Sequence, residues 1–240
     1  MVVTSVEKLE PLSLRLEWMN DLAQAVAFLE SLNLAHGDIR PENILLDRNR
    51  LKLSDFDCTA KIGTNYEACM APYGRILNDK ESDQGECGTF GFLGPRTEHF
   101  ALGSVYYLIN YGFEVYGDRC VTDDPYDHGP KVVDLLQNME FPKLDSNPLI
   151  DNIIDKCWHN KYSRILELAS HAKKLLRENT NSENSDLMDH TGLEEDFLSK
   201  KEFCQRLEKG GLLGVLSSGE PEDIGFTCDW YRHSTVSKVE

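Results

Sequence analysis

The alternation of apolar and polar residues predicts a chain made mostly of helices. Residues 12–32 place apolar side chains at near-helical spacing, namely at Leu14, Trp18, Leu22, Val26 and Leu29. Such spacing is typical of one amphipathic helix with a buried face. Similar helical patterns follow at residues 97–112, 130–139, 148–158 and 163–179. Proline and polar residues at 140–147 impose a break between two of these helices.

Two shorter apolar runs, at residues 43–47 and 51–56, predict strands on either side of a turn at 47–50. Residues 58–96 are rich in glycine, polar residues and turn formers, which is typical of a long surface loop. The predicted fold class is therefore mainly α, with one small β hairpin.

The C-terminal part of the chain has a different character. Residues 178–192 are polar and acidic, and we expect a linker there. The residues that follow predict one amphipathic helix, with Thr191 and Glu194 in a capping-box pattern. Its apolar face would be formed by Leu193, Phe197, Cys204 and Leu207. The last segment carries the aromatic residues Phe226, Trp230 and Tyr231.

Composition narrows the class of protein. The chain has 240 residues, of which 40% are hydrophobic and 28% charged, as in a soluble globular protein. No apolar run is long enough to span a membrane, and the N-terminal residues do not resemble a secretion signal. The net charge of −16 argues against nucleic acid and anionic lipid as partners. Seven scattered cysteines with no C-x-x-C pair predict free thiols, no zinc site and a cytoplasmic or nuclear location.

The stretch AHGDIRPENILLDRNRLKLSDFD, residues 35–57, carries the candidate chemistry. Asp38 and Asn43 lie in a predicted loop, and Asp55 ends the second predicted strand. Carboxylate and amide oxygens are ligands that suit Mg²⁺, and Arg40 supplies a fixed positive charge beside them. A proton-accepting acid, oxygen ligands for a metal and a cation for phosphate are the requirements of phosphoryl transfer.

These residues resemble the eukaryotic protein kinase family, in its catalytic loop H-R-D-L-K-P-E-N and the following D-F-G. The resemblance implies that His36 is a packing residue, that Asp38 is the catalytic base and that Arg40 replaces the lysine that contacts the phosphate. Asn43 and Asp55 would be the Mg²⁺ ligands, with ATP as the phosphate donor. The P-E-N sequence favours serine or threonine of a protein substrate as the acceptor.

The resemblance continues downstream. GTFGFLGPRTEHFALG is similar to the end of a kinase activation segment and the helix after it, with Arg96 in place of the glutamate of A-P-E. Glu98 stands where that helix normally begins with aspartate, and Arg164 stands in the place of a family arginine near the end of the lobe. The resemblance covers residues 12–177 and implies a kinase C-terminal lobe.

Several departures bear on activity. No Gly-rich loop or strand lysine of an N-terminal lobe can be placed in the sequence, so we expect phosphoryl transfer by this chain alone to be weak or absent. Gly37 replaces an arginine, and Asp57 replaces the glycine of D-F-G, which tolerates unusual backbone angles. The family's Glu–Arg pair becomes Arg96 and Arg164, which we expect to repel each other.

Three functions remain open on this evidence. They are a Ser/Thr protein kinase, a pseudokinase that serves as an interaction module, and a small-molecule phosphotransferase similar to aminoglycoside and choline kinases. The last class favours H-G-D and D-x-D, which would make Asp57 a further metal ligand. Without an N-terminal lobe, the lobe face near Asp38 and Asp55 would be apolar and exposed, so self-association is expected.

The predicted organisation has three parts. A kinase-like C-terminal lobe spans residues 1–177, with the catalytic loop at 36–43, the D-F-D stretch at 55–57 and an activation-type loop at 58–96. A linker at 178–192 and an acidic tail with one helix at 193–240 follow. The partners we expect are proteins, as substrates or as binding partners.

Overall fold

The computed structural model describes Val6, residues 8–66 and 70–180, and residues 198–203, 205, 206 and 209. The chain divides into two units, Met1–Met188 and Asp189–Glu240, and each is considered by itself. The helices of the first unit are α1 (Leu12–Ser31), α2 (Pro95–Tyr111), α3 (His128–Gln137), α4 (Pro148–Trp158) and α5 (Ile165–Thr180). Its strands are β1 (Leu34–Ala35), β2 (Ile44–Asp47), β3 (Arg50–Leu53) and β4 (Ala60–Lys61). The short 3-10 turns are η1 (Pro41–Asn43) and η2 (Pro125–Asp127).

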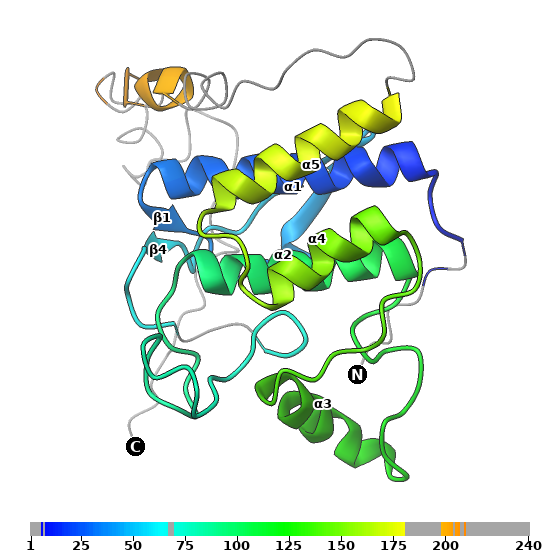
Figure 1. Cartoon of the computed structure of the whole chain (residues 1–240). Helices are drawn as coiled ribbons and strands as arrows, with labels where there is room; N and C mark the ends of the chain where they lie inside the picture. The colour runs from blue at the N-terminus through cyan, green and yellow to red at the C-terminus, as the bar shows by residue number, and fades with distance from the viewer. Residues whose placement is uncertain are drawn as a thin grey trace, which may run out of the picture. The chain divides into compact units, whose positions relative to one another are not determined.

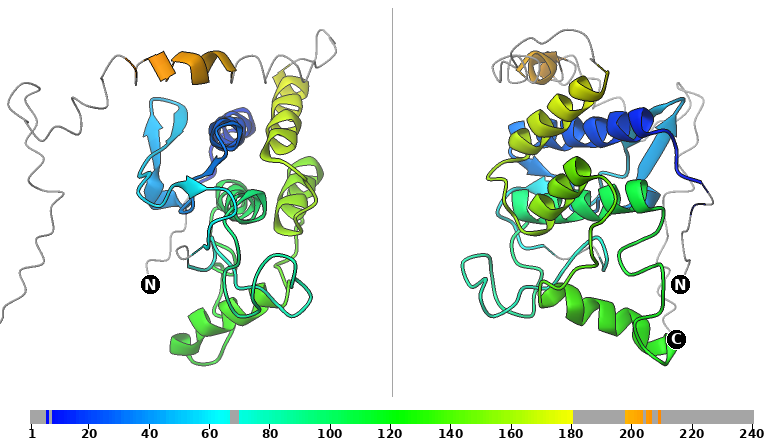
Figure 2. Two further views of the ribbon diagram at one scale, coloured as in Figure 1. Left: turned by 90° about the vertical axis from the view of Figure 1, so that its left-hand side faces the viewer. Right: turned by 45° about the vertical axis from the view of Figure 1, so that its right-hand side comes forward.

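Four helices form the core of the first unit. Viewed along their axes, α1 lies beside α5, and α2 lies beside α4 below them (Figures 1 and 2). The predicted helix at 12–32 is confirmed as α1, which buries Leu22, Val26 and Leu29 and leaves Leu14 and Trp18 half-buried. The chain turns after α1 at Asn33, where a φ of 59° is incompatible with a right-handed helix.

Helix α2 is the most deeply buried element. Thr97 and Gly94 bond reciprocally at its start, and Gly112 in the left-handed conformation ends it. A Cβ added to Gly103 would lie 2.8 Å from Cβ of Cys157 in α4, so glycine permits the close approach of the two helices. Trp158 is 2% exposed and stacks on Phe141, so it is an anchor of the core.

The predicted hairpin is confirmed as the antiparallel pair of β2 and β3, in which Ile44 lies opposite Leu53. Asp21 of α1 holds this hairpin, because its carboxylate accepts from the Arg50 guanidinium and from the Leu51 N–H. A second small sheet pairs β1 with β4, so residues before and after the D-F-D stretch meet.

The other predicted helices agree closely with α2, α3, α4 and α5. Helix α4 has the predicted bounds, because Asn147 accepts from the N–H groups of Leu149 and Ile150 and Pro148 occupies the first turn. Helix α5 continues to Thr180, so residues 178–180 of the expected linker are helical.

The interpretation of residues 58–96 as a surface loop is wrong in part. This segment contributes β4 and buries several of its side chains, namely Tyr66, Tyr73, Arg75, Leu77 and Leu93. Hydrogen bonds such as Tyr66 N–H to Gly91 O, at 2.9 Å, fold it back on itself. It is a packed layer of the lobe.

In the second unit, residues 198–203, 205, 206 and 209 are helical. The predicted N-cap at Thr191, the apolar face residues Leu193, Phe197, Cys204 and Leu207, and the aromatic segment lie outside the described residues. None of the described helices is long and apolar enough to cross a membrane.

Candidate active site

The predicted catalytic loop connects β1 to β2 and turns at Gly37. This residue has a φ of 79°, in the region that favours glycine. A Cβ added there would lie 2.7 Å from the carbonyl oxygen of Cys58. Because Cys58 directly follows the D-F-D stretch, the close approach at Gly37 brings the two motifs together. An arginine at this position, as in the family, would not fit this backbone.

The side chain of Glu98, in α2, holds the predicted catalytic loop in place. Its carboxylate accepts the backbone N–H of His36 at 2.8 Å and that of Gly37 at 3.2 Å. The side chain is buried, and this burial raises the pKa of Glu98 to about 7, although the two N–H donors favour the ionised form. The sequence indicated only that Glu98 replaces an aspartate at the start of this helix; its contact with the loop required the structure.

Asp38, Asn43 and Arg40 lie in direct contact. Asn43 Nδ2 donates to Asp38 Oδ2 at 2.7 Å and to the Asp38 carbonyl at 2.9 Å. Arg40 Nε lies 3.3 Å from the same Oδ2 in an ion pair that lacks hydrogen-bond geometry. Asp38 Oδ1 receives no hydrogen bond from the described residues. One carboxylate oxygen is thus held in place, and the other keeps its capacity to accept a proton.

His36 is a packed histidine, as predicted. Its ring is fully buried and lies 3.0 Å from the Ser54 carbonyl through Nε2. Burial lowers its pKa, against the opposing effects of that carbonyl, Asp38 and Asp55, so the neutral form is favoured. The ring of Phe56 lies 5.2 Å from it, between centroids. His36 therefore links the catalytic loop to the D-F-D stretch.

Asp55 and Asp57 are both exposed. In the described part of the chain φ is positive at Asp55, at 58°, but not at Asp57. The freedom of backbone angles that glycine gives at the third position of D-F-G is therefore not required at Asp57 in this backbone. Positive φ occurs instead at the first position, where aspartate tolerates it better than most residues.

The carboxylates of the two motifs share one electrostatic environment at Cys58. Partial burial raises the pKa of the Cys58 thiol, and the charges of Asp38, Asp55 and Asp57 raise it further, while Arg40 lowers it. The three acids and the arginine named from the sequence therefore all lie within electrostatic range of Cys58.

The donor set fits an ion that shares its shell with phosphate. Asn43 donates to Asp38 through Nδ2, so its amide oxygen points away from Asp38. Asp55 has an exposed carboxylate. Among the described residues, no three His, Cys, Asp or Glu side chains are grouped as a metal site. Mg²⁺ is held by few protein oxygens and completes its shell with water and phosphate, so such a group is not required.

Arg96 and Arg164 have separate partners. Arg96 donates to the Phe90 carbonyl, and Arg164 Nε lies 3.9 Å from Glu30, whose carboxylate also accepts N–H groups at the start of α5. The repulsion that lowers the pKa of Arg96, after the larger effect of burial, comes from Arg75. The expected conflict between Arg96 and Arg164 is therefore replaced by one with Arg75.

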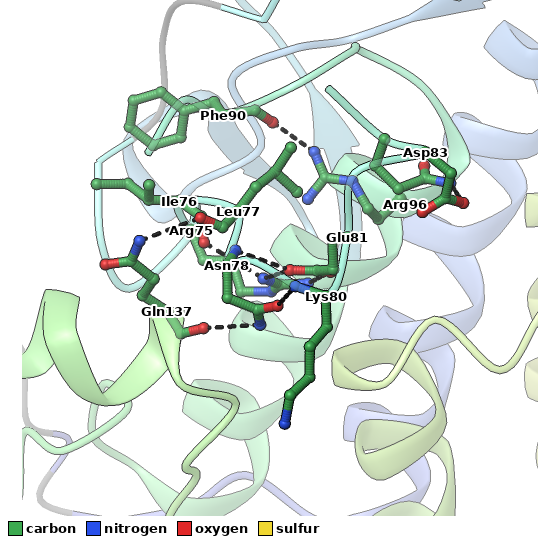
Figure 3. Close-up of polar contacts among 11 residues, drawn as sticks. Arg75, Ile76, Leu77, Asn78, Lys80, Glu81, Asp83, Phe90, Arg96 and Gln137 are labelled. Carbon is green, nitrogen blue, oxygen red and sulfur yellow. Dashed lines mark hydrogen bonds and ion pairs between the residues drawn. The ribbon is translucent and has the colours of Figure 1, made fainter. Parts of the chain in front are cut away.

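Glu81 offsets that conflict. Its carboxylate accepts from both terminal nitrogens of Arg75, one of them at 2.6 Å, inside the activation-type segment (Figure 3). This pair could not be predicted from the sequence, because two charged residues six positions apart in a polar stretch have the pattern of a solvated loop.

The family assignment follows from these features together with sequence comparison. The model of the protein kinase domain family matches residues 6–176, which is most of the chain. The chain belongs to the protein kinase family.

The curated relatives are serine/threonine kinases and related catalytic chains. The mouse (Mus musculus) liver/testis phosphorylase b kinase gamma catalytic chain is 38% identical over 79 residues, covering 32% of this chain and 16% of that protein. CBL-interacting serine/threonine-protein kinase 2 of Arabidopsis thaliana is 26% identical over 166 residues, covering 60% and 34%. CBL-interacting protein kinase 10 of Oryza sativa subsp. japonica is 29% identical over 115 residues, covering 44% and 23%. The chain thus spans at most about a third of these relatives' length.

Proposed function

We propose that this chain carries the phosphoryl-transfer half of a Ser/Thr protein kinase site that uses ATP and Mg²⁺. The observation that supports this most strongly is the contact of Asp38 with both Asn43 and Arg40, beside the D-F-D stretch. Family membership supports the reaction class, and the P-E-N sequence favours serine or threonine as the acceptor.

In this proposal the free oxygen of Asp38 accepts the proton of the substrate hydroxyl. The hydroxyl oxygen forms a bond to the γ-phosphorus of ATP while the bond from that phosphorus to the leaving oxygen of ADP breaks. Arg40 lies beside Asp38 and balances the charge that spreads over the phosphoryl oxygens. Asn43 and Asp55 would hold Mg²⁺, and Asp57 adds a second exposed carboxylate next to them. The ion would supply charge neutralisation on the phosphates.

Kinases also bind ATP through a Gly-rich loop and a strand lysine of an N-terminal lobe. The resemblance over residues 12–177 concerns the C-terminal lobe. Leu45 and Leu46 of β2 and Phe56 of the D-F-D stretch are exposed apolar side chains close in sequence to Asn43 and Asp55. Because successive residues of a strand point to opposite faces, one of the two leucines lies on each side of the hairpin. In this proposal the nucleotide covers the exposed apolar side chains on the side of the metal ligands.

The proposal extends to location and organisation. The kinase-like lobe would end with α5, and the tail would follow as a separate region. Four described cysteines are free thiols (Cys58, Cys87, Cys120 and Cys157), which supports a reducing cytoplasmic or nuclear setting.

Calorimetry of Mg²⁺·ATP binding, followed by transfer of labelled phosphate to a basic protein mixture, tests the proposal. We expect Asp55→Ala to abolish binding and Asp38→Asn to abolish transfer while binding persists. Absence of binding at millimolar nucleotide would overturn the proposal in favour of a pseudokinase interaction module. Transfer to metabolites but not to proteins would favour the small-molecule class.

A further inference from the structure

A cavity of about 370 Å³ lies between the activation-type segment and α3. None of the proposed catalytic or metal-binding residues lines it. This volume is at the lower end of the range of ligand pockets, and it suits a bulky side chain better than a cofactor. Its apolar lining comes from Met70, Ile76 and Phe90 of the segment and from Pro130, Val133 and Leu136 of α3.

The two walls of this cavity are tied together at one end. Asn78 Nδ2 donates to the Gln137 carbonyl at 3.0 Å, and Gln137 Nε2 donates to the Leu77 carbonyl at 3.0 Å (Figure 3). Arg96 holds the Phe90 carbonyl on the segment's side. A site with hydrogen-bonded walls is largely preformed, which lowers the entropic cost of binding.

The charge inside the cavity does not favour an anionic ligand. Arg75 is the charged residue of the lining, but its side chain is 2% exposed. Both of its terminal nitrogens bond Glu81, and its Nε is buried, with no hydrogen-bond partner among the described residues. The charge of Arg75 is therefore balanced within the protein, and Glu81 already occupies the paired nitrogens that a carboxylate or a phosphate would bind.

The charges around the cavity favour a cationic partner. Asp79 follows Asn78, which bonds Gln137. Asp134 follows Val133, a lining residue on α3. Both aspartates are exposed. The turn that leads into α3 adds Asp123, Asp124 and Asp127, also exposed. Against these acids the same stretches carry Lys80 and Lys131. The stretches of chain that adjoin the lining residues are therefore net acidic, and we refer to their five aspartates as the acidic rim.

We propose that this cavity is a docking site for a protein segment in which one bulky aliphatic side chain is flanked by lysine or arginine. The aliphatic side chain fills the cavity, and the flanking cations lie over the acidic rim. Docking of this kind needs neither ATP nor a metal, so it goes beyond the proposed phosphoryl transfer and can hold or fail independently of it.

Gly129 gives a direct test of the cavity. It lines the cavity in the first turn of α3, and a Cβ added to it would meet no atom within 4 Å. Gly129→Leu should therefore fill the space without disturbing the fold, since leucine also forms helix better than glycine. Gly129→Ser is the matched control, because it changes the same position and leaves most of the space open.

The probe is a fluorescein-labelled peptide with a central leucine, arginines and lysines on both sides, and alanine spacers without hydroxyl groups. Its binding is measured by fluorescence anisotropy on the full chain without nucleotide. We expect Gly129→Leu, and replacement of the peptide leucine by alanine, each to weaken binding about tenfold or more, and Gly129→Ser to change it less than about twofold. Asp127→Asn combined with Asp134→Asn should weaken binding and reduce its salt dependence.

Three results would overturn the proposal. One is no binding of the leucine peptide at millimolar concentration. Another is equal binding of the leucine and alanine peptides, which would indicate charge attraction alone. The third is unchanged affinity in Gly129→Leu, which would place the peptide elsewhere on the protein.

Discussion

The carboxylate of Glu98 in α2 accepts the backbone N–H of His36 at 2.8 Å, across 62 positions of sequence. This bond joins the most buried helix of the lobe to the loop that presents Asp38. Since the second oxygen of Glu98 bonds Gly37, the conformation of the loop depends on one buried carboxyl group.

Glu98→Gln should therefore change how stability depends on pH. The pKa of Glu98 is about 7 in the folded state against an ordinary value of 4.5, so the folded state binds the proton more tightly. The wild type then loses stability as pH rises through this window, by up to about 3 kcal/mol, and the glutamine variant lacks this loss. Urea unfolding over the window measures the difference. Glu140→Gln, at an exposed site, is the control, and parallel curves for wild type and Glu98→Gln would contradict the prediction.

Replacing Gly37 by the arginine of the family should destabilise the fold. Gly37→Arg and Gly37→Ala both force a Cβ to 2.7 Å from the Cys58 carbonyl at a φ of 79°, and we expect a loss of about 2 kcal/mol or more. Thermal unfolding measures it.

Gly63→Ala separates the two causes of that loss. Gly63 has a φ of 94°, but a Cβ there would meet nothing within 4 Å. Gly63→Ala should therefore cost about 1 kcal/mol from the backbone alone. Equal losses at the two glycines would show that the contact with Cys58 has no effect.

The sequence predicted the helices well because each depends on local signals. Helix α4 is bounded by the Asn147 cap and Pro148, both visible as residue types. The candidate catalytic residues could be named because a short motif carries them. In contrast, the burial of Arg75 and the contact between Glu98 and His36 depend on long-range pairing. A charged residue in a polar stretch looks the same whether it is solvated or bonded to a distant partner.

Glu81→Gln should destabilise the activation-type segment. It removes the carboxylate that pairs with the buried Arg75 and that offsets the repulsion between Arg75 and Arg96, which costs about 3 kcal/mol or more. Relative to the wild type, Glu81→Gln should increase amide hydrogen exchange more in residues 70–93 than in α4. Arg75→Met combined with Glu81→Gln should recover part of the loss, because it removes the uncompensated cation. No recovery in the double variant would contradict this explanation.

The same pair predicts acid sensitivity of this segment. The hydrogen bonds from Arg75, with its charge, lower the pKa of Glu81 despite the opposing effect of burial. Its contribution is therefore complete above the ordinary carboxyl pKa and is lost as pH falls through the lowered value. Protection of the amides in residues 70–93, measured relative to their intrinsic exchange rates at each pH, should fall on acidification in the wild type. It should change less in the double variant, in which the pair is absent.

Asp55 and Asp57 should differ in their importance for the metal. Asp55→Asn should weaken Mn²⁺ binding in the presence of ATP about tenfold or more, because it removes a proposed direct ligand. Asp57→Asn should weaken it only about threefold, since we expect Asp57 to act mainly through its charge. Electron paramagnetic resonance of free Mn²⁺ measures both without requiring catalysis, and exposed Asp47→Asn is the control. Equal losses at Asp55 and Asp57 would show that both are ligands, as in the D-x-D pattern of small-molecule kinases.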